Sequence, residues 1–127
     1  MRTLLFKRQF TLMLNAEGEI QTKEFELPSD VKSVVGYSLT SRRKDLLWYR
    51  TSVGLYVAGE ELITDGMDAA EYMFGHNHPA RTFAFGELPI GSTNRQVRLR
   101  AKDEAVAGFA FSPYAVKLVL TCTKTAN

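Results

Sequence analysis

Apolar and polar residues alternate along most of this chain, and that alternation constrains its fold more than any other feature of the sequence. The first segment carries one apolar face, interrupted only at Arg8, that consists of Leu4, Phe6, Phe10, Leu12 and Leu14. A period of two is typical of a half-buried β-strand, whose successive side chains point to opposite faces of a sheet. The pattern returns every ~8–15 residues. It predicts further strands over 20–27, 34–41, 47–57, 62–63, 81–85, 95–101, 106–111 and 114–123.

Two connections have distinct local signals. Residues 15–19 contain a turn glycine, Gly18, so we expect the first two strands to form a hairpin. Residues 65–74 have helical spacing, with Asp65 as a potential N-cap and apolar residues that include Met67 and Met73. The sequence therefore predicts one short helix in a connection, held in place by the rest of the protein.

The order of these segments selects a fold class. Helices do not alternate with strands, which argues against a parallel α/β sheet, and no long internal repeat recurs. At 127 residues the chain has the length of one domain. We expect a single all-β domain over 1–127, an antiparallel β-sandwich of about eight strands with a jelly-roll or related Greek-key topology.

Composition excludes several classes of protein. Hydrophobic residues make up 45% and charged residues 24%, which is typical of a globular domain, and the net charge of +2 is too small to indicate nucleic acid as the main partner. No apolar run is long enough for a membrane span. The apolar run near the N-terminus is also too short for the apolar region of a signal peptide. The single cysteine, Cys122, falls in an alternating run and is expected to be a buried apolar residue.

The two histidines, His76 and His78, lie two residues apart. On a strand both rings would point to one side, which is how a cupin-type metal site begins. Such a site needs a glutamate about four residues later and a further histidine, whereas Glu87 lies nine residues on and no third histidine exists. A metal would have to recruit Asp68, Glu71 or Glu87. We interpret the pair as part of a polar loop, and we expect no metal and no cofactor.

A row of cations follows in the strand over 95–101. Arg98, Arg100 and Lys102 share one face of an extended chain, and the 42–44 loop could lengthen the row. The functional interpretation is binding of phosphate or of an acidic partner. The plainer interpretation is a solvated sheet face paired across strands with Glu24 and Glu26.

The only tryptophan, Trp48, is the third candidate. On a strand over 47–57 it would face away from Tyr49 and share a side with Arg50. If that side faces outwards, Trp48 and Arg50 become candidates for a protein interface or a sugar-stacking platform. Burial against loops or a neighbouring sheet is the interpretation that we favour for Trp48.

No motif for nucleophilic hydrolysis, phosphate binding or a zinc protease occurs in the chain. We therefore expect a protein without enzymatic activity.

Two passages, 27–36 (LPSDVKSVVG) and 111–120 (FSPYAVKLVL), together with the length and strand spacing, resemble small single-jelly-roll structural proteins of virions. Penton-type and head-decoration proteins of bacteriophages are the comparison. The resemblance implies a capsid-associated component that forms a homo-oligomer or binds other virion proteins, and it transfers no functional residues. The expected location is the virion if a phage encodes the chain, and otherwise the cytoplasm. A carbohydrate- or protein-binding sandwich and a cupin-like metal enzyme are the alternatives.

Overall fold

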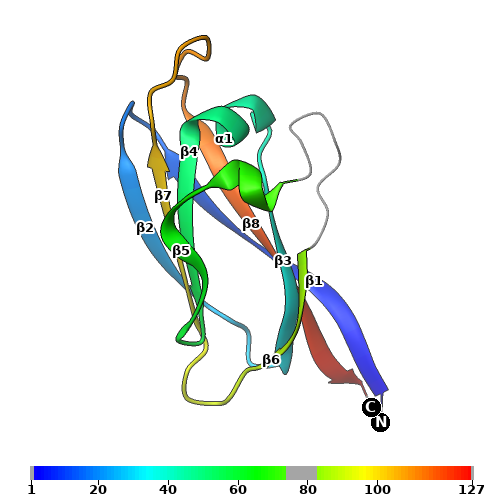
Figure 1. Ribbon diagram of the computed structural model, residues 1–127. Coiled ribbons are helices and arrows are strands. Elements are labelled where there is room, and N and C mark those ends of the chain that lie inside the picture. The colour runs from blue at the N-terminus through cyan, green and yellow to red at the C-terminus, as the bar shows by residue number, and fades with distance from the viewer. Residues whose placement is uncertain (1, 74–82, 127) are drawn as a thin grey trace.

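Two four-stranded antiparallel sheets pack face to face in the computed structural model, which describes residues 2–73 and 83–126 (Figure 1). One sheet, sheet A, has the order β1 (Arg2–Leu14), β8 (Tyr114–Ala126), β3 (Ser33–Thr40) and β6 (Phe83–Pro89). The other, sheet B, has the order β2 (Ile20–Glu26), β7 (Gln96–Asp103), β4 (Thr51–Val57) and β5 (Glu60–Asp68). Two short helices, α1 (Lys44–Arg50) and η1 (Ala69–Tyr72), lie in the connections. The expected β-sandwich of eight strands is confirmed.

The pairing of the strands follows the jelly-roll order. β1 pairs with β8, β2 with β7, β3 with β6 and β4 with β5, all antiparallel. These are the pairs of one long antiparallel ribbon that is folded over to make two sheets. Additional pairing of β3 with β8 and of β4 with β7 joins the ribbon segments within each sheet.

The core lies between the sheets and follows the alternation of the sequence. On β7 the side chains of Val97, Leu99 and Ala101 are buried, whereas those of Gln96 and Arg98 are exposed. The same alternation on β8 buries Val116, Leu118, Leu120 and Cys122. Full burial of each large aliphatic side chain contributes roughly 1.5–3 kcal/mol, so these faces supply most of the driving force for folding.

The largest error in the expected strands concerns residues 47–50. The strand expected over 47–57 begins only at Thr51, because α1 occupies Lys44–Arg50. Burial in α1 falls on Leu46, Leu47 and Arg50, which is helical spacing, and Asp45 and Arg50 suit the helix dipole at its two ends. The adjacent pair of leucines fits a helix better than the alternation that we read across it.

Three other expectations change. The helix expected over 65–74 is replaced by the end of β5 and a four-residue 3-10 turn, η1. The segment 106–111 forms no strand. The turn after β1 closes no hairpin, since β2 crosses to sheet B and pairs with β7. A local turn signal cannot reveal that its two strands belong to different sheets.

The sheet edges are formed by β1 and β6 in sheet A and by β2 and β5 in sheet B. β1 is paired with β8 along its whole length, from Arg2 to Leu14. Since β3 meets β8 only between Ser33 and Thr40, the distal end of the β1–β8 ribbon projects from the sandwich (Figure 1). Within the described part of the chain, nothing pairs with the outer edge of β1.

Candidate functional site

A buried ion pair joins α1 to the end of β7. Arg50 is 2% exposed and Asp103 is fully buried. The guanidinium donates two parallel hydrogen bonds to the carboxylate, from Nε to Oδ1 at 3.0 Å and from Nη2 to Oδ2 at 2.8 Å. A third hydrogen bond, from Nη1 to the backbone oxygen of Phe109 at 2.8 Å, ties the 104–113 connection to the same arginine. Such a bidentate pair fixes geometry as well as charge.

Further donors complete the surroundings of Asp103. The backbone N–H of Gly18 donates to Oδ2 at 3.0 Å, and the hydroxyl of Tyr114 donates to Oδ1 at 3.0 Å. The hydroxyl of Thr51 lies 2.7 Å from the hydroxyl of Tyr114 and 3.1 Å from the backbone oxygen of Leu46, and it donates its one proton to one of these two oxygens. The buried carboxylate is therefore fully satisfied, as burial of a charge requires.

The pKa values describe a pair that stays ionised. Burial alone would raise the pKa of Asp103, but the hydrogen bonds from Arg50, Gly18 and Tyr114 outweigh burial and lower it. The hydrogen bond to Asp103 raises the pKa of Arg50. Because neither group exchanges a proton near neutral pH, the cluster is suited to fixing the chain rather than to acid–base catalysis.

A pocket of about 560 Å³ opens beside this cluster, under the 104–113 connection at the top of Figure 1. Its polar lining includes Glu17 and Arg50, and its aromatic lining includes Phe109 and Phe111. Tyr49 stacks on Phe109 with ring centroids 4.0 Å apart and stands 42% exposed. The pocket is partly aromatic but shallow and open to solvent, so a ligand held there would stay largely exposed.

The structure separates Trp48 from Arg50. Both lie on α1, where residues two apart do not share a face. Arg50 is buried against Asp103, so it offers no exposed interface side chain, contrary to its expected position. Trp48 is half-buried, and the exposed aromatic ring of this helix is that of Tyr49.

The cationic row lies as expected on the outer face of β7. Arg98 is exposed, and Arg100 and Lys102 are half-buried. Across the strands Arg98 stands opposite Glu24, and its guanidinium lies 4.2 Å from the ring centroid of Tyr56. This arrangement has the character of a solvated sheet face with local partners.

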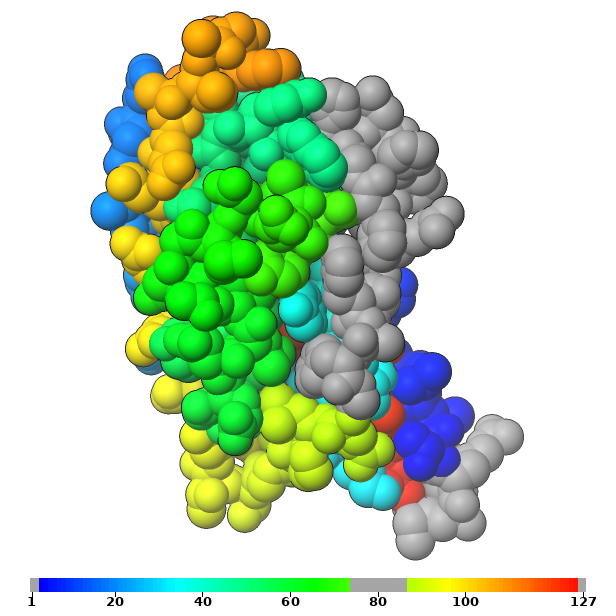
Figure 2. All heavy atoms as spheres, viewed as in Figure 1, coloured from blue at the N-terminus to red at the C-terminus, as the bar shows by residue number. Residues whose placement is uncertain are grey.

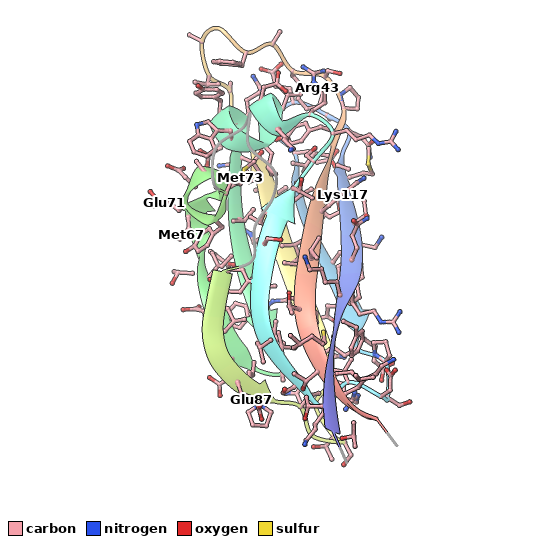
Figure 3. The ribbon with its side chains drawn as sticks, turned by 90° about the vertical axis from the view of Figure 1, so that its right-hand side faces the viewer. Arg43, Met67, Glu71, Met73, Glu87 and Lys117 are labelled. Atoms are coloured by element: carbon pink, nitrogen blue, oxygen red, sulfur yellow. The ribbon has the colours of Figure 1, made fainter. Side chains whose placement is uncertain are left out.

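The 42–44 loop does not lengthen that row. Lys44 begins α1, and Arg42 and Arg43 lie at the outer face of sheet A, where they border a groove of about 470 Å³ that we call the basic groove. The groove is lined by, among others, Thr11, Met13, Arg42, Arg43, Ala115 and Lys117. Figure 3 shows Arg43 and Lys117 on this side of the molecule.

The charges of the basic groove are only partly compensated. Arg43 forms an ion pair with Asp45 at 3.1 Å. Among the described residues, no carboxylate lies within ion-pair distance of Arg42 or Lys117. Met13 is 44% exposed and gives the groove an apolar portion. The groove therefore presents positive charge that the described chain does not neutralise.

Carboxylates collect on the opposite side, along β5 and η1. We call this surface the acidic edge, and its members, all exposed, are Glu60, Glu61, Asp65, Asp68 and Glu71. Figure 2 shows the side chains of this segment (green) at the molecular surface, and Figure 3 places Met67 and Glu71 on the side away from Lys117. No lysine or arginine occurs from residue 51 to residue 80, a signal that our sequence analysis overlooked.

The metal hypothesis for His76 and His78 falls outside the described residues. Among the residues that are described, no group of three or more His, Cys, Asp or Glu side chains is arranged to hold a metal ion.

No helix in the described ranges is long and apolar enough to cross a membrane. A comparison with protein families, curated proteins and solved structures found no match to the chain.

Proposed function

We propose that this protein is a non-enzymatic assembly component that works as an oligomer, with a virion as the assembly. The observation that carries the proposal is the edge strand β1. It is 13 residues long, and no described element pairs with its outer edge. Its outward face carries Leu5, which is 69% exposed, and Met13. Long edge strands with exposed apolar side chains are sites of association between chains.

The remaining surface adds support. The basic groove and the acidic edge are two strongly charged surfaces that would be neutralised by contact with other molecules. The jelly-roll fold occurs in viral capsid proteins, lectins and cupins, so it is compatible with assembly without selecting it. The virion as the assembly rests on the sequence resemblance described above.

Light scattering coupled to size-exclusion chromatography tests the proposal. We expect a mass that is a multiple of 14.3 kDa and that falls on dilution. The variant Leu5→Ser with Met13→Ser should weaken the association, since it removes the two exposed apolar side chains of β1. A wild-type protein that stays at the monomer mass at the highest attainable concentration would rule out an assembly role.

A ligand-binding module is the second candidate, favoured by the pocket beside Arg50 and by the Tyr49–Phe109 stack. An exposed aromatic face next to polar groups is suited to stacking on a sugar ring. A glycan array tests it: binding that disappears in Tyr49→Ala and persists in Trp48→Ala would support a carbohydrate site at this pocket. Absence of binding by the wild-type protein would remove carbohydrate as the ligand.

A further inference from the structure

The acidic edge and the basic groove have opposite sign and lie on different parts of the described surface. The acidic edge belongs to β5 and η1, at the far end of sheet B from β2. The basic groove belongs to the outer face of β1 and β8 and to Arg42 and Arg43, which precede α1. In Figure 3 Glu71 lies on one side of the molecule, and Arg43 and Lys117 lie on the other. Two copies in the same orientation can therefore bring unlike charges together.

A two-fold symmetric contact through either edge strand would bring like charges together. An antiparallel pairing of β1 with a second β1 about its midpoint, Arg8, would place that arginine directly opposite its own copy, with the two copies of Lys7 in the adjacent pairs. The same pairing of β5 would bring its four carboxylates into one interface, since β5 contains no cation. Like charges directly opposite each other destabilise a strand pair. The charges on both edges thus act against symmetric pairing.

The apolar side chains of the two surfaces are also matched. Met67 lies within the acidic edge and is 38% exposed, and Met13 lies in the basic groove. Methionine adapts its shape to an irregular contact and is common at the centre of protein interfaces. Each surface therefore combines an apolar side chain with charges, and the charges of one surface are the opposite of those of the other.

From these observations we infer that the acidic edge of one copy docks in the basic groove of the next. The inference rests on the proposed assembly function and names its contact. The contact is heterologous, because it joins two different surfaces of the same chain. It therefore forms a closed ring if the rotation between copies closes, and an open filament if it does not. Salt should weaken the contact, since its charges lie at the surface.

Charge reversal tests the contact from both sides. One variant carries Glu60→Lys and Glu71→Lys at the acidic edge, and the other carries Arg42→Glu and Lys117→Glu at the groove. None of these four residues makes an ion pair with a described residue, so the fold should tolerate the changes. Each variant alone should self-associate at least about tenfold more weakly than the wild type. An equimolar mixture should regain association, because one variant keeps the native groove and the other the native acidic edge.

A matched control changes charge elsewhere. Lys23→Glu with Lys32→Glu reverses two exposed cations that do not line the groove, and it should associate like the wild type at equal ionic strength. Circular dichroism checks that each variant folds. If a double variant does not, Glu71→Lys and Arg42→Glu, each alone, take the place of the pairs.

The outcomes separate this inference from the proposed function. If the wild type associates but charge reversal has no effect, or the control weakens association equally, the inference is wrong and the assembly function stands. A wild type that is always monomeric overturns both. If that monomer binds heparin and the groove variant does not, the groove belongs to an acidic partner other than a second copy, which also overturns the inference.

Discussion

Replacing Asp103 with Asn tests whether the buried ion pair holds the 104–113 connection and α1 together. The substitution keeps the size of the side chain, so it opens no cavity, but it removes the negative charge opposite Arg50. That arginine is only 2% exposed, and the carboxylate that remains near it, Glu17 at 3.7 Å from Nη2, is itself 62% exposed and compensates the charge only weakly. Leaving one member of a buried pair uncompensated costs about 3–5 kcal/mol.

The expected loss is large compared with the stability of the whole domain. A typical domain is stable by about 5–15 kcal/mol, so Asp103→Asn should remove roughly a fifth or more of that free energy. Asp103 also accepts hydrogen bonds from Gly18 and Tyr114, and a carboxamide cannot accept all of these together with those from Arg50. The variant therefore loses hydrogen bonds in addition to the charge pairing.

Urea unfolding followed by the fluorescence of Trp48, the only tryptophan, measures the effect. Protein concentration must be equal across variants, because association contributes to apparent stability. The double variant Arg50→Met with Asp103→Leu should recover most of the loss, since it removes both charges. A loss below about 1 kcal/mol for Asp103→Asn, or a double variant less stable than the single one, would refute the assigned role of the pair.

Three further predictions follow from individual residues. The pKa of Asp103 is lowered below its ordinary value of 3.8, so its contribution to the free energy of unfolding is complete above about pH 4 and is lost as the pH falls through its folded-state pKa. Urea unfolding at pH 3 and at pH 7 should therefore show a smaller acid-induced loss of stability in Asp103→Asn than in the wild type. Gly54→Ala should destabilise by about 1–3 kcal/mol in thermal unfolding, because the added Cβ would lie 2.9 Å from the Cα of Asp65, whereas Gly91→Ala, with open space around it, should have no effect. Burial raises the pKa of the Cys122 thiol to about 11, so Ellman's reagent should react with it at pH 7 only after unfolding; rapid reaction of the folded protein would contradict its buried position.

The sequence predicted those parts of the fold that depend on local alternation. β1, β7 and β8 lie where the period of two placed them, because on each strand a more buried face alternates with a more exposed one. The alternation gave a wrong prediction at Leu46–Arg50, where a short helix runs directly into a strand. The helical spacing of apolar residues and the strand period of two overlap there. It also failed at β2, since pairing in a jelly roll joins strands that are far apart in the chain.

The candidate surfaces were harder to predict, for two different reasons. Arg50 and Asp103 are 53 residues apart, and no local pattern relates them. The basic groove likewise brings the 42–44 loop beside Lys117 only through the pairing of β3 with β8. The acidic edge is different, because its carboxylates follow one another over residues 60–71 without a cation. A count of charges along the chain would have found it.

Sedimentation equilibrium of the wild-type protein at two ionic strengths tests most directly whether this chain assembles through its charged surfaces. At about 0.05 M salt, where charges interact over more than 10 Å, we expect a mass well above 14.3 kDa that rises with concentration. At about 1 M salt the range falls to roughly 3 Å, and the mass should approach that of the monomer. A mass of 14.3 kDa under both conditions, or an oligomer that salt does not weaken, would contradict assembly through the acidic edge and the basic groove.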